Sequence, residues 1–189
     1  MKKVVIVHCW QGTPEYCWYP QTKKELEELG FVVEVPAMPD AENPNMQTWV
    51  PTLASRVGEP NESVYLVGHS IGCAAIMRYL ESLPENQKVG GVVFVAGFVD
   101  DLGYKELANF FETPINLAKI KTRANKFVAI HSDNDPFVPL NHGGIFKEQL
   151  GAELIVKQNM GHFSGPINNE ESCVSLPDVT QAIQKISNN

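Results

Sequence analysis

Six short runs of β-branched and aromatic residues constrain the fold more than any other feature of this chain. They occupy residues 4–7, 31–35, 64–67, 92–96, 127–130 and 153–156. Most of these runs are continuously apolar, as in strands that are buried on both faces, rather than alternating between apolar and polar residues. The pattern therefore predicts a mostly parallel sheet of six strands that is covered by helices.

Segments with helical character separate the six runs. Residues 20–29 place charged side chains on one side and leucines on the other, and residues 71–83 are largely apolar. The C-terminal tail follows Pro177, which is a favourable residue for a first helical turn, and it has apolar side chains at helical spacing. Strands that alternate with helices predict an open α/β fold of three layers, with helices on both faces of the sheet.

Residues 98–126 interrupt this alternation. They contain Phe98, Tyr104, Phe110 and Phe111, which we expect in a helix without a strand partner. The segment is either an ordinary long connection or a small cap over a functional site. Because no repeat, low-complexity tract or linker divides the chain, we expect one domain over residues 1–189, with 98–126 as its candidate cap.

The junction between the third run and the next helix carries a chemical motif. The sequence there reads VYLV-GHSIG, with Ser70 flanked by Gly68 and Gly72. A Gly-x-Ser-x-Gly match alone is weak, but a strand-to-helix turn is the setting of a nucleophile elbow. Glycines allow the strand and the helix to approach closely, and the amide of Ile71 can stabilise an oxyanion at the helix N-terminus. The junction predicts Ser70 as a nucleophile rather than as a helix-capping serine.

A serine nucleophile needs a base and an orienting carboxylate, which follow an elbow of this kind in the order Ser, Asp, His. His162 follows the sixth run in the sequence GHF and is the predicted base. The fifth run leads into HSDNDPFVP, which offers two carboxylates. We expect Asp135 to orient His162, because Pro136 stiffens its turn; Asp133 is the alternative, and it could instead cap the turn through its side chain.

The expected sheet order, 2-1-3-4-5-6, predicts where a ligand binds. Ligands of such sheets bind where the strand order reverses, which here lies between the first and third strands. The loop after the first strand, HCWQG at 8–12, would then face Ser70. It can supply the second oxyanion amide from Trp10, with Gln11 as the next candidate. His8 is expected to fix this loop rather than react.

Several aromatic residues near this crevice are candidates for substrate binding. Trp18, Phe137 and Phe163 are expected to line an acyl pocket, although core packing would explain them equally well. His69 lies within the elbow, but its side chain should point away from Ser70, so we expect a packed, hydrogen-bonded histidine. His131, Asp133 and Asp135 could be interpreted as metal ligands, but no second ligand group accompanies them, so no metal is expected.

The combined motifs resemble those of the α/β-hydrolase superfamily, and in particular the small serine hydrolases grouped with retinoblastoma-binding protein 9. The shared features are VVIVHCWQG, Trp18-Tyr19-Pro20, Met38-Pro39-Asp40, Trp49, VGHSIG, DNDPFVP and GHF. The resemblance implies an intracellular hydrolase core without the large lid of lipases. It also implies Ser70 as nucleophile, Asp135 as acid and His162 as base. Cys9 departs from the His-Gly pair of many α/β-hydrolases.

Composition limits the kinds of binding partner and the cellular compartment that we expect for this protein. The formal net charge is −7, and Lys and Arg do not cluster, which argues against nucleic acid and anionic membrane surfaces. The four cysteines form no Cys-x-x-Cys pair, and no apolar run has the length of a signal peptide core or a membrane span. We therefore expect a cytoplasmic protein with free thiols.

Together these features predict a serine hydrolase, with the character of a carboxylesterase. It would cleave a small ester or related acyl substrate through an acyl-enzyme on Ser70, without a cofactor. The alternative is a protein-binding or regulatory module on a hydrolase scaffold, because a fold does not settle a function. A protein partner is compatible with the sequence, but no motif indicates one.

Overall fold

The computed structural model describes residues 1–165 and 173–188. Six parallel strands form one sheet in the order β2-β1-β3-β4-β5-β6, which confirms the predicted order. The sequence predicted a mostly parallel sheet, and every pair of neighbouring strands is in fact parallel. The strands are β1 (Lys3–Val7), β2 (Val32–Glu34), β3 (Val64–His69), β4 (Gly91–Val95), β5 (Phe127–Ser132) and β6 (Glu153–Lys157).

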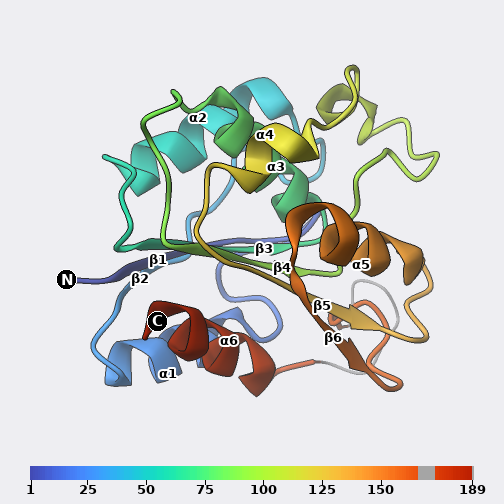
Figure 1. The fold of residues 1–189 in the computed structure, drawn as a ribbon. Helices are drawn as coiled ribbons and strands as arrows, with labels where there is room; N and C mark the ends of the chain where they lie inside the picture. Colours follow the sequence, from blue (N-terminus) through green and yellow to red (C-terminus); the bar gives the residue numbers. More distant parts are fainter. Residues whose placement is uncertain (166–172, 189) are drawn as a thin grey trace.

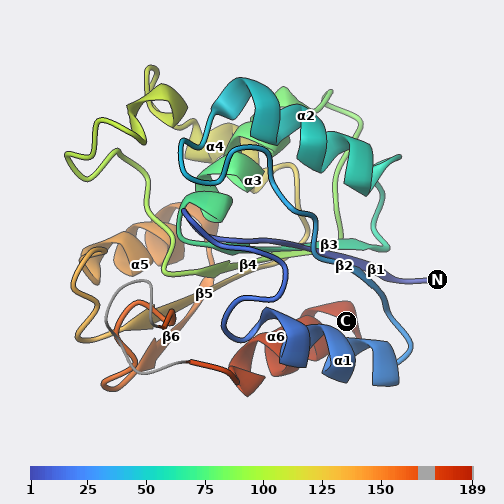
Figure 2. The ribbon, with the colours of Figure 1, turned by 180° about the vertical axis from the view of Figure 1, so that it is seen from behind.

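Helices cover both faces of this sheet (Figure 1; Figure 2, from behind). One face carries α2 (Met46–Val57), α3 (Ile71–Ser82), α4 (Leu117–Lys121) and α5 (Asn141–Ile145), which continues into the π-helical turn η2 (Phe146–Leu150). The other face carries α1 (Tyr19–Glu28) and α6 (Pro177–Ser187). Among the described residues, no helix combines the length and apolar character that crossing a membrane requires.

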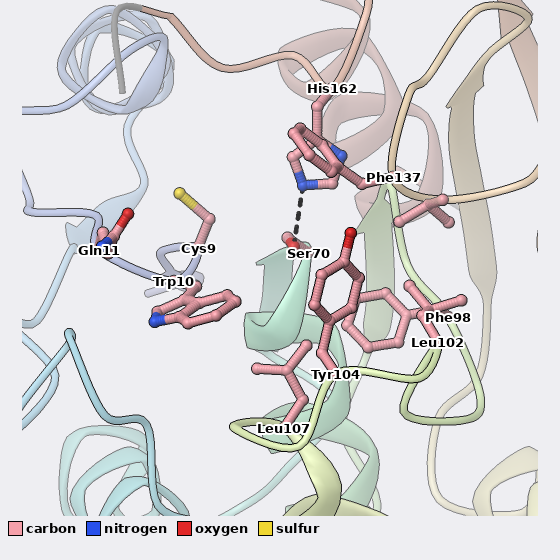
Figure 3. Close-up of a pocket in the computed structure, with 11 residues that line it drawn as sticks. Cys9, Trp10, Gln11, Ser70, Phe98, Leu102, Tyr104, Leu107, Phe137 and His162 are labelled. Atoms are coloured by element: carbon pink, nitrogen blue, oxygen red, sulfur yellow. Dashed lines mark hydrogen bonds between the residues drawn. The ribbon is translucent and has the colours of Figure 1, made fainter. Parts of the chain in front are cut away.

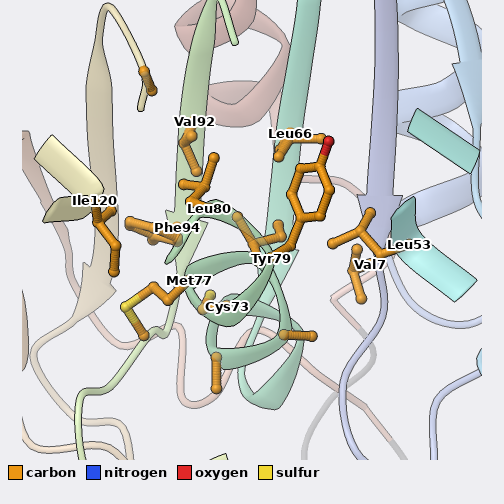
Figure 4. Close-up of a cluster of buried hydrophobic side chains, with 14 of the residues drawn as sticks. Val7, Leu53, Leu66, Cys73, Met77, Tyr79, Leu80, Val92, Phe94 and Ile120 are labelled. Atoms are coloured by element: carbon orange, nitrogen blue, oxygen red, sulfur yellow. The ribbon is translucent and has the colours of Figure 1, made fainter. Parts of the chain in front are cut away.

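The core consists of two apolar clusters, one on each face of the sheet. Every residue of β3, β4 and β5 is buried, as their continuous apolar sequences predict. Helix α3 fills the centre of the larger cluster with Cys73, Met77 and Leu80 (Figure 4). Full burial of a side chain of this size stabilises a fold by about 1.5–3 kcal/mol. The elbow is thus held between a fully buried strand and a fully buried helix face.

Two helical segments differ from the sequence-based expectation. Helix α2 was not predicted; its N-cap, Asn45, accepts a hydrogen bond from the Gln47 amide, and Pro51 lies inside it. In residues 98–126, the expected long helix is replaced by extended chain, the short 3-10 helix η1 (Ala108–Phe110) and α4. Asn109 fixes this segment to the start of α2, because its side chain donates to the Pro44 carbonyl and accepts from the Met46 amide.

Candidate active site

Ser70 lies at a sharp turn between β3 and α3. Its φ of 56° and ψ of −123° fall in a region that favours glycine and that costs other residues on the order of 1–3 kcal/mol. The two flanking glycines permit this turn. A Cβ on Gly72 would lie 2.4 Å from the Val7 carbonyl oxygen, and one on Gly68 would lie 2.8 Å from Cys73 Cα. The close approach of β1, β3 and α3 therefore excludes side chains at both positions.

The backbone conformation of Ser70 leads to a prediction about stability. Ser70→Gly is expected to have a free energy of unfolding about 1 kcal/mol higher than that of Ser70→Ala, because glycine adopts this φ and ψ without strain and alanine does not. The gain is smaller than the full strain because glycine makes the unfolded chain more flexible. Urea denaturation measures the difference in the free energy of unfolding between the two variants, provided that their m-values are equal. An alanine variant that is as stable as the glycine variant would show that the turn is unstrained.

A chain of hydrogen bonds runs from Ser70 through His162 to Asp135. Ser70 Oγ lies 2.9 Å from His162 Nε2 (Figure 3), and His162 Nδ1 lies 2.8 Å from Asp135 Oδ2. The side chains of His162 and Asp135 are 6% and 2% exposed. The three residues come from distant parts of the sequence, and the structure brings them together at the ends of β3, β5 and β6.

Asp135 is held as a carboxylate. Its Oδ1 accepts hydrogen bonds from the amides of Phe137 (2.9 Å) and Val138 (3.0 Å). Burial alone would raise the pKa of Asp135, but the hydrogen bond to His162, electrostatic attraction to that side chain and the two amides outweigh burial and leave the pKa below its usual value. An ionised carboxylate accepts the Nδ1 proton of His162. The unprotonated Nε2 of His162 can then accept the hydroxyl proton of Ser70.

Asp133, the alternative carboxylate, has a different partner. It is exposed, and its Oδ1 accepts a hydrogen bond from the Asn159 amide at 2.8 Å. Its neighbours act in the same way, because Ser132 Oγ accepts from the Met160 amide and Asn134 Oδ1 accepts from the Gly161 amide. Three consecutive side chains, at the end of β5 and directly after it, thus bind three consecutive amides of the loop after β6. They hold the turn that carries Asp135 against the loop that carries His162.

Two backbone amides next to Ser70 could bind an oxyanion. No described residue accepts a hydrogen bond from the amide of Ile71, at the N-terminus of α3, or from that of Trp10, after β1. The alternative donor, Gln11, is occupied, because its amide donates to the Ala41 carbonyl at 2.9 Å. Of the two candidates in the first loop, Trp10 is therefore the one with an available amide.

His8 fixes the direction of the Trp10 amide. Its Nδ1 lies 2.8 Å from the Cys9 carbonyl oxygen, and its Nε2 accepts from the Met38 amide at 2.9 Å. Burial lowers the pKa of His8, so the ring is neutral, with its proton on Nδ1. In a trans peptide the N–H points opposite to the C=O, so a bond to the Cys9 carbonyl also orients the Trp10 N–H. This arrangement agrees with the expectation that His8 fixes the loop.

A cavity of about 130 Å³ opens beside Ser70. It is mainly apolar, and none of the described side chains that line it is a carboxylate, a lysine or an arginine. Its walls are formed by Cys9, Trp10, Gln11, Ser70, Phe98, Leu102, Tyr104, Leu107, Phe137, Val138 and His162 (Figure 3). The rings of Trp10 and Tyr104 meet edge to face, and so do those of Phe137 and His162. An uncharged group of limited size fits such a site.

The aromatic residues predicted for substrate binding separate into two places. Phe137 lines the cavity, whereas Trp18 and Phe163 do not. Both are fully buried in the core cluster between the sheet and helices α1 and α6, and Trp18 Nε1 donates to the Phe163 carbonyl at 3.1 Å. The structure thus places these two residues in the core, which was the alternative to substrate binding. Trp18 supports the loop that carries His162 from behind.

Four cavity residues of one segment were not assigned to substrate binding from the sequence. Phe98, Leu102, Tyr104 and Leu107 all belong to the segment 98–126, which was considered only as a whole as a candidate cap. Phe98 and Leu107 are buried, and Tyr104 is 37% exposed. The available signal was the density of aromatic and apolar residues directly after β4, at the edge of the sheet where Ser70 lies.

Known proteins resemble this chain in sequence and in fold. The family model for serine hydrolases matches residues 4–185. YdeN from Bacillus subtilis (strain 168) is 32% identical over 179 residues, which cover 94% of this chain and 92% of YdeN. The crystal structure of the ydeN gene product superimposes with a TM-score of 0.92 over the full length of both chains. Serine hydrolase RBBP9 from Rattus norvegicus is 29% identical over 149 residues, which are 77% of each chain.

Solved structures with low sequence identity resemble this chain in fold. A protein of the α/β superfamily from Xanthomonas campestris pv. campestris has a TM-score of 0.63 at 14% identity, covering 99% of this chain and 96% of that protein. This likeness concerns the fold alone, whereas the family model and YdeN concern the sequence along almost the whole chain. The chain therefore belongs to the serine hydrolase family and has the α/β-hydrolase fold that its motifs predicted.

Proposed function

We propose that this serine hydrolase cleaves carboxylic esters of small, uncharged acyl groups through an acyl-enzyme on Ser70. The observation that carries the proposal is the continuous hydrogen-bond chain from Ser70 through His162 to Asp135, which ends at the apolar cavity. Each link has the length of a good hydrogen bond, and each side chain is held by its surroundings before substrate binds.

The reaction proceeds in two halves. In the first, His162 Nε2 takes the Ser70 proton while Oγ forms a bond to the ester carbonyl carbon, and the amides of Ile71 and Trp10 bind the resulting oxyanion. The C–O bond to the alcohol then breaks, and the alcohol leaves with the proton from His162. In the second half, His162 takes a proton from water as that water attacks the acyl-enzyme. The acid leaves, and Ser70 recovers its proton.

The cavity supports a limit on the size and the charge of the acyl group. Its volume of about 130 Å³ is close to that of an engineered apolar cavity of about 150 Å³ that binds benzene. Chains of up to about six carbons or a single ring would fill it, and longer chains would extend into water. A carboxylate within it would lose hydration without gaining an ion pair, because no cationic side chain of the described residues lines the walls.

A matched pair of esters tests this limit. We expect kcat/KM for p-nitrophenyl butyrate to exceed that for the p-nitrophenyl monoester of succinate by about 100-fold, which corresponds to about 2.7 kcal/mol of lost transition-state stabilisation. The two acyl groups have similar length and differ mainly in the terminal charge. A lauroyl ester is expected to react about 10-fold more slowly than the butyrate. Equal rates for butyrate and succinate would exclude the apolar cavity as the acyl site.

A mechanism-based probe tests the covalent step itself. A fluorophosphonate should label the wild-type protein on Ser70, because the probe forms a stable adduct only with an activated serine. Mass spectrometry of the labelled peptide identifies the residue. A protein that neither labels nor hydrolyses any ester in the panel would contradict the proposed function and would favour a binding role on this scaffold.

A further inference from the structure

A second chain of hydrogen bonds passes behind Ser70, through residues to which the proposed reaction assigns no step. The Cys9 amide donates to Tyr19 Oη at 3.1 Å, and Tyr19 Oη lies 2.6 Å from His69 Nδ1. His69 Nε2 lies 2.8 Å from the carbonyl oxygen of His162. The chain joins four segments: the loop after β1, the first residue of α1, the end of β3 and the loop after β6.

The direction of each bond follows from the two ends of this chain. The His162 carbonyl can only accept, so His69 Nε2 carries a proton and donates it. In a neutral imidazole Nδ1 is then an acceptor, so Tyr19 donates its hydroxyl proton to it. The Tyr19 oxygen in turn accepts from the Cys9 amide. The arrangement therefore has one consistent set of donors, and it fixes the tautomer of His69.

The surroundings keep this set of bonds in place. Tyr19 and His69 are both 0% exposed. Burial, with a smaller contribution from repulsion by His162, lowers the pKa of His69 to about 3. The ring of His69 therefore stays neutral at any pH at which the protein would be assayed. The ring of His69 also lies close to the ring of His162, with 5.3 Å between their centroids.

The two ends of the chain are the segments that must remain aligned for the proposed reaction. At one end, Cys9 precedes Trp10, whose amide is the second oxyanion donor of the proposal. At the other end, the loop that carries His162 has positive φ values at Asn159, Gly161 and Phe163, an arrangement that needs external contacts to persist. Side chains after β5 bind the amides of this loop, and His69 binds its carbonyl at His162 itself.

We propose that Tyr19 and His69 are positioning residues, which hold the oxyanion loop and the peptide of His162 in a fixed relation across the elbow. Neither side chain touches the substrate. The inference rests on the proposed function, since it concerns alignment of the base and of the oxyanion donor. Misalignment of about 1 Å at such a centre can reduce a rate by about 100-fold.

Removal of one hydroxyl group tests the proposal. Tyr19→Phe keeps the buried ring and breaks the chain at its centre, and we expect kcat for p-nitrophenyl butyrate to fall by about 10- to 100-fold with KM within about three-fold of wild type. Tyr65→Phe is the matched control: it removes a hydroxyl from a buried ring in the same core cluster but outside the chain, and it should leave both constants unchanged. A Tyr19→Phe variant with wild-type kcat, or one altered only in KM, would overturn the proposal.

A conservative replacement at His69 gives a second test. Glutamine can present an amide N–H near the position of Nε2, whereas leucine cannot, so His69→Gln should retain at least about ten times more kcat than His69→Leu. Near-UV circular dichroism establishes that each variant is folded. If His69→Leu does not fold, the Tyr19→Phe result alone decides. Equal activity of the two folded variants would contradict a positioning role.

A spectroscopic readout separates failure of this inference from failure of the proposed function. Nitrogen-15 NMR of the imidazoles should show His69 as the Nε2–H tautomer in the wild type and in Tyr19→Phe, because the His162 carbonyl accepts from Nε2 in both. The Nδ1 signal of His69 should shift in Tyr19→Phe, where that nitrogen loses its hydroxyl donor. This signal does not depend on hydrolysis. A wild-type protein without esterase activity but with this tautomer would contradict only the proposed function. An active protein with the Nδ1–H tautomer at His69 would contradict the hydrogen-bond chain.

Discussion

Ser70→Ala is expected to reduce kcat for p-nitrophenyl butyrate by about 10⁴-fold or more and to abolish fluorophosphonate labelling. The hydroxyl is the group that forms the acyl-enzyme in the proposed reaction, and no side chain among the described residues of the cavity can replace it. Cys9 also lines the cavity, but burial raises the pKa of its thiol to about 11, so almost none of it is thiolate at neutral pH. The oxyanion amides remain in the variant, so a small residual activity above that of water is expected.

The control for this variant flanks the other end of β3. Ser63→Ala replaces an exposed serine directly before β3, at the opposite end from Ser70, and should leave kcat and labelling unchanged. Ser70→Ala retains the apolar cavity, so KM for butyrate should change little. Retention of more than about a tenth of wild-type kcat in a folded Ser70→Ala variant would exclude the acyl-enzyme on this residue.

The arrangement of the sheet was predictable because its signals are local. Most strands are continuous apolar runs, and the elbow sequence lies at a strand end, so the order of strands and the edge that holds Ser70 follow from general rules for parallel sheets. The meeting of Ser70, Asp135 and His162 was also expected from their positions after three such strands. The choice of Asp135 over Asp133 remained open in the sequence, because both carboxylates occupy the same turn.

Helix α2 shows where local rules fail. Pro51 lies in its interior, where proline removes a backbone hydrogen bond and usually ends a helix. The structure compensates through tertiary contacts: Trp49 and Leu53 are fully buried against the sheet, and Trp49 Nε1 donates to the Pro39 carbonyl at 2.7 Å. The spacing of Trp49, Leu53 and Val57 is helical, and it was the signal that could have revealed this element.

The walls of the cavity were less predictable for a different reason. Trp18 and Phe163 are near Ser70 in the fold, but the side of the sheet that each faces depends on the turns that precede them. Phe163 itself has a φ of 53°, which no periodic pattern anticipates. The residues of segment 98–107 that form the opposite wall lie in irregular chain, so neither helical nor strand periodicity could assign their direction. The density of aromatic and apolar residues in this segment indicated that it is packed against something, but not that it lines the cavity.

Asp135→Asn is expected to reduce kcat by about 10⁴-fold while leaving the fold intact. Oδ1 of residue 135 accepts the amides of Phe137 and Val138, and the oxygen of an asparagine would take that position for the same reason. The amide nitrogen would then face His162 Nδ1 and donate to it. His162 would be forced to carry its proton on Nε2, opposite Ser70 Oγ, where it cannot act as a base. The defect arises from the wrong tautomer of His162, without loss of any packing contact. Steady-state kinetics over a range of pH measures it.

Asp133→Asn is the control that makes this prediction specific. It removes the same charge two residues away, but its Oδ1 can still accept the Asn159 amide, so kcat should stay within about three-fold of wild type. Asp133→Ala removes that acceptor and should lower kcat about 10-fold by loosening the loop that carries His162. Charge near the site and contact with His162 are thereby separated, since both asparagine variants lose one negative charge and only one disturbs the imidazole. Equal losses in the two asparagine variants would assign the effect to charge, and a larger loss for Asp133→Asn would transfer the orienting role from Asp135 to Asp133.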